Sequence, residues 1–312
     1  MKQLNNRTMK NTKILVLVVL VVLVVFPKKA AASELSLGIY PPIIQIQTVP
    51  PAVMDTPITI HNYGGETVAL EISLKPFTAA KGENGEVLYM SGKNPLVYEN
   101  IKVRDNDEVV KKVVIGPRQN KTLNLYIDIP KDESVSDHYF SVVFISENKS
   151  KDKLNQSKIQ AGIATNVLLS IGSKEMIMGK IVEFSTPLFL EKGPVPFTVR
   201  LKNQSNHFIT PQGTISIKNI FGKTIGQVKL SPVNILAGSI RSQQTLWQEA
   251  LLFGPYTATL NIDASDNVPI LLKTVTFFVF PLWTFIALTG TVIIIFLTKN
   301  RLKRYRNKNL YL

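Results

Sequence analysis

Apolar and polar residues alternate along most of the region from Leu35 to Phe280. The alternation is clear in the stretches ITI at 58–60, VALEISL at 68–74, TLNLYI at 122–127, FTVRL at 197–201 and TATLNI at 257–262. A period of two is typical of strands that bury one face. No run of about 12 residues or more in this region has a helical period. The pattern therefore predicts antiparallel β-structure.

Turn residues divide these predicted strands at short intervals. They occur at Tyr63-Gly64-Gly65, Glu83-Asn84-Gly85, Gly116-Pro117, Glu191-Lys192-Gly193-Pro194 and Phe253-Gly254-Pro255. Glycine permits backbone angles that other residues avoid, and proline fixes φ and cannot continue a ladder. Many short strands with such punctuation are typical of β-sandwiches.

An internal repeat divides the region into two domains. PITIHNYGGETVALEISL matches PFTVRLKNQSNHFITPQGTISI, GPRQNKTLNLYID matches AGSIRSQQTLWQE, and DHYFSVVFIS matches GPYTATLNID. The last pair places Tyr139 and Tyr256 at the start of a strand, where immunoglobulin-like sandwiches use a tyrosine hydroxyl to cap a corner. We predict an all-β fold of two tandem immunoglobulin-like β-sandwiches, at 34–172 and 175–280, with an extra segment around Phe77–Val110 in the first.

The polar stretch ENKSKDKLNQSKIQ at 147–160 resembles an interdomain linker at first. Predicted strands flank it on both sides, however, and the second of them completes the first domain. We therefore predict a long hairpin loop.

The N-terminal 32 residues predict a secretory signal peptide. An apolar run from Ile14 to Phe26 follows a basic segment and precedes Ala30-Ala31-Ala32. The run is shorter than the roughly 20 residues that span a bilayer. Cleavage after Ala32 is the primary interpretation, and an uncleaved signal anchor is the alternative because Lys28 and Lys29 lie close to the cut. Either outcome exports the residues that follow.

A second apolar segment predicts a C-terminal transmembrane helix at 281–298. No charged residue occurs from Thr274 to Thr298, and the basic tail 299–312 then places the C-terminus in the cytoplasm by the positive-inside rule. A buried core helix is the alternative. The basic residues of the tail could also bind anionic lipid headgroups, although their role in setting the topology is enough to explain them. These features predict a single-pass protein of a bacterial cell membrane with extracellular N-terminal domains and the second sandwich next to the membrane.

The net charge of +14 would suggest a nucleic-acid partner if it were evenly spread. Twelve basic residues lie in the two terminal segments, so the central region carries only about +2. We therefore expect no nucleic-acid partner. The chain has no cysteine, which excludes disulfides, thiol nucleophiles and cysteine-bound zinc, and favours a bacterial surface protein.

Candidate chemistry is sparse. The histidines His61, His138 and His207 fall on separate predicted turns or strand ends, and we interpret each as a polar turn residue. Motifs of metalloproteases, hydrolases and nucleotide-binding proteins are absent. We expect no catalytic residues, no cofactor and no enzymatic activity. Trp247, in a strand of the second domain, fits a core position better than a ligand platform.

One acidic cluster is a weak candidate for a metal site. Asp105, Asp107 and Glu108, with Asn106 between them, could offer closely spaced oxygen ligands to calcium. The cluster lacks the loop glycine and the spacing of a known calcium site. A solvated turn is the alternative, and the one that the residues favour.

The order of these parts resembles the bacterial WxL-interacting protein family. The resemblance rests on the signal peptide, the opening segment LSLGIYPPIIQIQTVPPAVMDTPITIHNYGGETVALEISLKPFTA, the DHYFSVVFIS strand, the second sandwich and the C-terminal segment. It implies a peptidoglycan-binding first domain and a second domain that engages partner proteins. The second domain is short for the family, and the resemblance assigns no ligand-contacting residue.

Taken together, these features predict a non-enzymatic surface protein that binds peptidoglycan or envelope proteins and tethers them to the membrane. The alternative is a structural stalk or a chaperone-like assembly factor for surface polymers, which an exposed, pairable edge strand in the first domain would favour. An enzyme is the third possibility, disfavoured because acids and histidines do not converge in the sequence.

Overall fold

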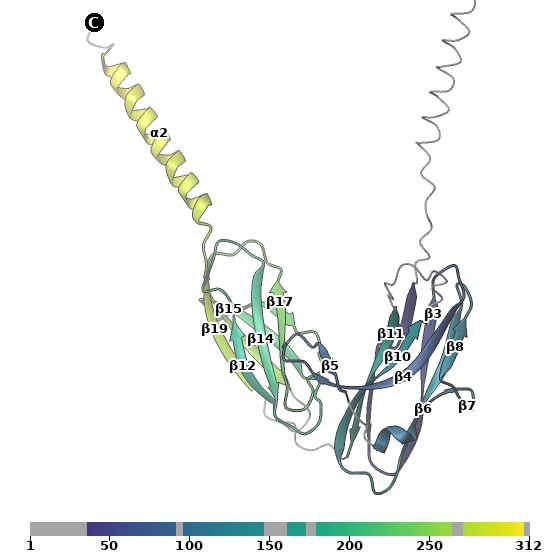
Figure 1. Cartoon of the computed structure of the whole chain (residues 1–312). Helices are drawn as coiled ribbons and strands as arrows, with labels where there is room; N and C mark the ends of the chain where they lie inside the picture. The colour runs from purple at the N-terminus through teal and green to yellow at the C-terminus, as the bar shows by residue number, and fades with distance from the viewer. Residues whose placement is uncertain (1–35, 92–95, 147–160, 173–178, 264–270, 309–312) are drawn as a thin grey trace, which may run out of the picture.

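The computed structural model describes residues 36–91, 96–146, 161–172, 179–263 and 271–308. The predicted signal peptide and the predicted loop at 147–160 lie outside these ranges. The described chain is all-β apart from a 3-10 helix, η1, and one α-helix, α2 (Figure 1). Its elements are β1 (Leu37–Tyr40), β2 (Ile43–Thr48), β3 (Ala52–Asn62), β4 (Val68–Ala79), β5 (Val87–Tyr89), η1 (Leu96–Asn100), β6 (Ile101–Asp105), β7 (Glu108–Val109), β8 (Lys112–Ile115), β9 (Asn120–Ile129), β10 (Ser136–Ser146), β11 (Gly162–Ile171), β12 (Gly179–Ser185), β13 (Phe189–Leu190), β14 (Val195–Asn203), β15 (Gln212–Asn219), β16 (Thr224–Lys229), β17 (Ile240–Trp247), β18 (Gly254–Asp263), β19 (Leu271–Val279) and α2 (Leu282–Lys308).

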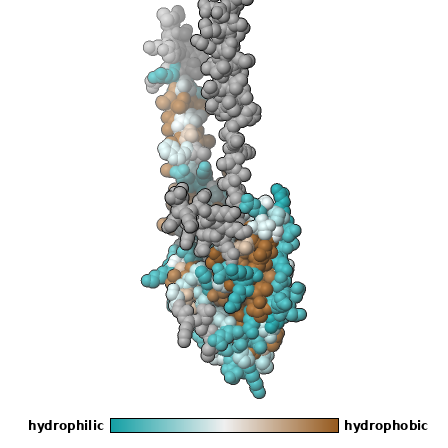
Figure 2. All heavy atoms as spheres, turned by 45° about the vertical axis from the view of Figure 1, so that its right-hand side comes forward, coloured by the Kyte–Doolittle hydropathy of each residue, from teal (hydrophilic) through white to brown (hydrophobic). Residues whose placement is uncertain are grey.

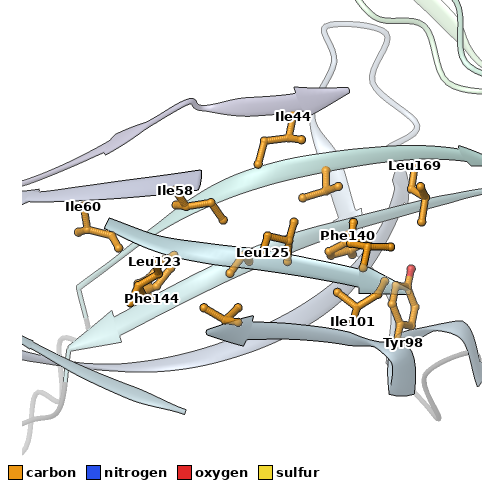
Figure 3. Packing of buried hydrophobic residues seen from close by; sticks show 14 of the residues in the cluster. Ile44, Ile58, Ile60, Tyr98, Ile101, Leu123, Leu125, Phe140, Phe144 and Leu169 are labelled. Carbon is orange, nitrogen blue, oxygen red and sulfur yellow. The ribbon is translucent and has the colours of Figure 1, made fainter. Parts of the chain in front are cut away.

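The first sandwich packs two sheets face to face. Sheet 1 has the strand order β1-β3-β9-β6-β7, and sheet 2 has the order β2-β11-β10-β4, with β5 and β8 paired to opposite ends of β4. The predicted hairpin across 147–160 has β10 and β11 as its antiparallel strands. Alternate residues of β9 and β10 point inward, so that Leu123, Leu125, Phe140 and Phe144 meet in one apolar layer between the sheets (Figure 3).

The second sandwich has a three-stranded sheet, β12-β14-β17, and a five-stranded sheet, β13-β19-β18-β15-β16. Every second residue of β14 is buried, from Val195 to Asn203. The core includes Phe197, Phe277 and Trp247, so the tryptophan is a core residue rather than an exposed platform. Burying a large apolar side chain contributes about 1.5–3 kcal/mol. In a chain without cysteine, this packing takes the place of disulfide bonds.

A buried asparagine organises the equivalent turn in each sandwich. The Asn62 side chain donates to the carbonyl groups of Glu66 and Gly116 and accepts from the N–H of Gly64. Asn203 donates to the carbonyl groups of His207 and Ile235 and accepts from the N–H of Ser205. The amide supplies both a donor and an acceptor, which a turn at the end of a buried strand needs. Asn62 ends β3 and Asn203 ends β14, the first strands of the two matched segments.

The C-terminal prediction is corrected by the structure. The charge-free part of helix α2, Leu282–Thr298, is shorter than the roughly 20 residues of a spanning helix, and the helix then continues through basic residues to Lys308. Among the described residues, no helix combines the length and the apolarity needed to cross a membrane. The predicted transmembrane helix at 281–298 is therefore wrong. The single-pass topology, the cytoplasmic tail at 299–312 and the bacterial cell membrane localisation that depended on it are withdrawn with it.

Asn62→Ala should lower the free energy of unfolding by about 1–3 kcal/mol, because buried backbone groups lose their hydrogen-bond partner. Urea denaturation of the full chain measures the change. Asn84→Ala is the matched control, since its amide makes an exposed contact with Glu86 and its loss should cost less than about 0.5 kcal/mol. Equal effects of the two variants would contradict this role for Asn62.

Candidate interdomain cleft

The carboxylate of Asp137 joins the two sandwiches. Asp137 lies in β10 of the first sandwich, and its side chain is 3% exposed. One oxygen lies 2.6 Å from His207 Nδ1, and the other accepts a hydrogen bond of 2.6 Å from the backbone N–H of Phe208. Both partners belong to the connection between β14 and β15 in the second sandwich. A buried carboxylate needs such donors because it has left water.

Ser170 completes a serine, histidine and aspartate group, but its geometry is not that of a catalytic triad. Ser170 Oγ lies 2.8 Å from His207 Nδ1, the same nitrogen that contacts Asp137. A triad needs the serine and the carboxylate on opposite ring nitrogens. The other nitrogen, Nε2, is buried without a hydrogen-bond partner, and Ser170 is 2% exposed. The group is therefore an interdomain contact rather than a site open to substrate.

The two tyrosines matched by the internal repeat have different roles. Tyr256 bonds through its hydroxyl to both backbone groups of Phe253, three residues earlier, which is a corner contact within the second sandwich. The Tyr139 hydroxyl instead donates to Asp137 in its own strand. It also accepts a hydrogen bond across the domain boundary, from the N–H of Ala237. Burial, followed by the hydrogen bond to Asp137, raises the pKa of Tyr139, which therefore stays protonated as a donor.

A hairpin of the first sandwich, Phe77–Tyr89, extends to the second sandwich, and we call it the arm (Figure 1). At its turn, both carboxylate oxygens of Glu83 accept hydrogen bonds of 2.6 Å from Arg200 in β14. The Glu83 carbonyl accepts a third from the N–H of Ser242 in β17. The hydrogen bond from Arg200 lowers the pKa of Glu83. The fork of Arg200 fits a carboxylate on two points, so the contact fixes the direction of the arm.

A cavity of about 380 Å³ lies between the arm, sheet 2 and the second sandwich, and we call it the interdomain cavity. Its apolar lining includes Ile43, Phe77 and Leu168 from the first sandwich. The second sandwich contributes Val233, Leu236, Ile240 and Arg241. Clefts at domain interfaces with apolar walls and a few polar groups are typical binding sites.

A second cavity, of about 320 Å³, lies on the outer face of sheet 2. Its lining includes Tyr89, Val143, Ile145 and Ala164. Val143 and Ile145 alternate along β10 with the core residues Val142 and Phe144, and Val143 lies opposite Ala164. Their side chains therefore point away from the core. We call these four residues the outer strip.

A chain of hydrogen bonds joins the two cavities. Tyr89, on the outer strip, donates to Ser141, and Ser141 donates to Asn166, which lines the interdomain cavity. Figure 2 shows that apolar side chains gather in a strip bordered by hydrophilic ones on the face turned forward in that view. We call the outer strip and the interdomain cavity together the cleft.

Part of strand β11 beside the outer strip has no partner strand. β2 pairs with β11 only from Asn166 to Ile171. On that side, within the part of the chain that the structure describes, no strand pairs with Gly162–Thr165. Since Asn166 directs its N–H to Pro42 on that side, the N–H groups of Gly162 and Ala164 face the same way. Among the residues that the structure describes, the sheet therefore has a short open edge beside an apolar surface.

The residues singled out in the sequence lie away from this cleft or play a different role in it. Asp105 pairs with Lys121 at 2.6 Å, Asp107 lies in the turn between β6 and β7, and Glu108 begins β7 opposite Asp105. Within the described ranges, no group of three or more histidine, cysteine, aspartate or glutamate residues could hold a metal ion. His61 stacks on Tyr63. His138 contacts Ser136, and burial lowers its pKa.

Sequence reasoning missed Asp137, Glu83, Arg200 and Arg241. Asp137 and Arg241 lie near strand ends, Glu83 lies in a turn and Arg200 lies within β14, and the period-two pattern treats each of these charged residues as solvated. His207 was interpreted as a polar turn residue but is buried at the interface. The extra segment after Phe77 was the available signal for the arm. An insertion present in only one repeat has no equivalent place in the sandwich core and must pack elsewhere.

Comparisons with known proteins do not decide the family of this chain. No family model matches it. No match was found among the curated proteins either. Among solved structures, the class 5 fimbriae chaperone CfaA is 14% identical, with 77% of this chain and 98% of that chain covered and a TM-score of 0.39.

Two further solved structures have similar values. The E. coli chaperone DraB is 11% identical, with 78% of this chain and 97% of that chain covered and a TM-score of 0.36. The structure of the Salmonella enterica SafA pilin in complex with the SafB chaperone matches at 8% identity, with 78% and 99% covered and a TM-score of 0.37. At these scores the likeness carries no weight for function, and the resemblance to the WxL-interacting family stays a prediction.

Asp137→Ala should destabilise the contact between the sandwiches. The Phe208 N–H, the Tyr139 hydroxyl and His207 would lose a buried acceptor, and each such loss costs about 1–3 kcal/mol. Urea denaturation with tryptophan fluorescence, together with small-angle scattering, should reveal lower stability and a wider distribution of domain orientations. Asp132→Ala, in the exposed turn before β10, should change neither. An unchanged scattering profile for Asp137→Ala would refute the interdomain role.

Arg200→Gln should release the arm while leaving both cores intact. Because Arg200 lowers the pKa of Glu83 below its ordinary value, the contact stabilises the wild type fully above that ordinary pKa and is lost as the pH falls through the lowered pKa. Hydrogen exchange of residues 80–86 should therefore be faster in the variant at pH 7, and should rise in the wild type only at acidic pH. Lys229→Gln, an exposed cation on β16, is the control. Equal exchange in all three proteins would contradict the contact.

Proposed function

We propose that this chain is a non-enzymatic binding protein that holds an extended segment of a partner polypeptide in the cleft, as a chaperone-like assembly factor would. The open edge of β11 at Gly162–Thr165 beside the outer strip is the observation that carries the proposal. An unpaired edge offers N–H and C=O groups to an incoming strand. An adjacent apolar surface accepts alternate side chains of that strand.

The apolar surface beside the open edge fits such a ligand. A strand added at β11 would place every second side chain over the outer face of sheet 2, where Val143 and Ala164 lie. Its backbone would pair with the N–H and C=O groups of Gly162 and Ala164 on the side of β11 where no described strand pairs with them. The hydrophobic contacts would supply affinity, and the edge would fix direction and register.

Peptidoglycan, the main ligand expected from the sequence, is favoured less by these surfaces. A glycan presents many hydroxyl groups, and each costs free energy when it is buried against apolar walls without a partner. The cleft lining is largely apolar, with Ile43, Phe77 and Leu168 on one side and Val233 and Leu236 on the other. A polypeptide with apolar side chains is the better match.

The arm gives the cleft a fixed shape. Its turn is held by Glu83, Arg200 and Ser242, so one wall of the interdomain cavity is bound to both sandwiches. A site formed before the partner arrives loses less conformational entropy on binding. The contacts of Asp137 add to this preorganisation by fixing the two sandwiches relative to each other.

Panning a displayed library of random peptides of about 12 residues, long enough to extend along the cleft, against the purified full chain tests this function. The selected peptides should carry alternating apolar residues. Val143→Glu should raise the dissociation constant of a selected peptide about tenfold, because it places a charge on the apolar surface. Fluorescence anisotropy measures this constant. Val53→Glu, at an exposed position of sheet 1, is the matched control and should bind like the wild type.

A second variant separates strand pairing from apolar contact. Ala164→Pro removes one N–H from the open edge, at a position where an edge strand tolerates proline. It should reduce affinity for the same peptide while retaining the β-structure seen by circular dichroism. Failure to select any peptide, or equal affinity of Val143→Glu and Val53→Glu, would overturn the proposed function.

A further inference from the structure

Arg241 lies in the interdomain cavity, and no acid among the described residues pairs with it. Its Nε atom is buried and has no hydrogen-bond partner. In the described part of the chain, the ion pairs involve Lys121, Arg200 and His207 but not Arg241. Burial lowers the pKa of Arg241. A partly desolvated guanidinium that lacks an anion is costly to the folded protein.

The arm holds this guanidinium in place. Gly85, at the arm turn, has φ +88, and a Cβ atom added there would lie 0.8 Å from Arg241 Nη1. Only glycine provides both this backbone conformation and this space. The guanidinium therefore packs against the backbone of the arm, although no acid of the arm pairs with it. Glu86 lines the same cavity, but its carboxylate accepts a hydrogen bond from Asn84 and makes no ion pair with Arg241.

The amide side chains of the cavity also leave donors available. Asn166 Oδ1 accepts from Ser141, and Asn234 Oδ1 accepts from Thr210 and Gln45. In each case the amide oxygen is occupied, so the NH₂ group is the part left to bind a ligand. Both asparagines line the same cavity as Arg241. Arg241 and the amide groups of Asn166 and Asn234 thus offer donors in a cavity with largely apolar walls, and Glu86 is the one carboxylate among its lining residues.

We propose that the interdomain cavity binds a carboxylate carried on an apolar body, with Arg241 as its charged partner and the amides of Asn166 and Asn234 as further donors. A carboxylate is an acceptor on both oxygens and matches the planar fork of arginine. The apolar walls would hold the body that carries it. The inference rests on the proposed function only in placing the ligand in the same cleft. The carboxylate could belong to a small organic acid or to the C-terminus of a peptide.

Isothermal titration of the full chain with two matched pairs of probes tests the proposal. One pair is 4-phenylbutyrate and 4-phenylbutyramide, and the other is the peptide acetyl-Val-Leu-Val with a free or an amidated C-terminus. For at least one pair, the acid should bind about tenfold or more tightly than the amide, as expected for a hydrogen bond to a charged group. Preference confined to the first pair identifies a small acid as the ligand, and preference in the peptide pair identifies a C-terminus.

Two variants show whether the cavity is responsible. Arg241→Gln should bring the ratio of acid to amide affinity close to one, and Arg241→Lys should retain part of it. Asn166→Asp keeps the oxygen that accepts from Ser141 but replaces the donor with a negative charge, so it should lower acid affinity without loss of thermal stability. Equal affinity for acid and amide, no binding of any probe, or an unchanged ratio in Arg241→Gln would overturn the proposal.

The two proposals fail separately. If the amidated peptide binds in a manner that depends on Val143 but no acid is preferred, the proposed function stands and the carboxylate site is refuted. If 4-phenylbutyrate binds through Arg241 while no peptide binds and Val143→Glu has no effect, the carboxylate site stands and the polypeptide function is refuted.

Discussion

The burial of the Asp137 carboxylate between the two sandwiches is the constraint on which the cleft depends. The carboxylate lies in a strand of the first sandwich and takes its donors from the second. Since an unpaired buried charge costs several kcal/mol, the free energy is lowest when the loop of His207 and Phe208 is docked. The cavity then forms between surfaces whose relative position is already set.

The arm provides a second attachment at some distance from the first. Glu83 reaches Arg200 through two hydrogen bonds, and its carbonyl reaches the backbone of β17. One contact alone would allow the sandwiches to rotate about it. Two contacts on different elements restrict that rotation and place Gly85 against Arg241. The same arm therefore stabilises the interface and forms one wall of the cavity.

The cleft joins two kinds of surface that suit a polypeptide ligand. Beside the open edge of β11, the outer strip is apolar and can accept alternate side chains. Farther along the same sheet, the interdomain cavity adds hydrogen-bond donors to apolar walls. Apolar contact contributes affinity without direction, whereas strand pairing and a charged group impose direction and position. The division of these roles along one sheet is consistent with a binding site rather than with a chemical one.

The sequence by itself determined the all-β character of the described chain, because period two and regularly spaced turns report local burial on alternate sides of a strand. Its internal repeat matched the segments that contain Asn62 and Asn203, but the structure was needed to show that each amide satisfies buried backbone groups. It did not determine the character of helix α2 correctly. The charge-free run was interpreted as a membrane span, but the helix continues through basic residues to Lys308. Only the tertiary structure decided that Tyr139 crosses to the second sandwich while Tyr256 stays in its own, and that Glu83 finds Arg200. These contacts join residues far apart in the sequence, and an isolated charge in a turn or on the polar face of a strand carries no period that could predict its partner.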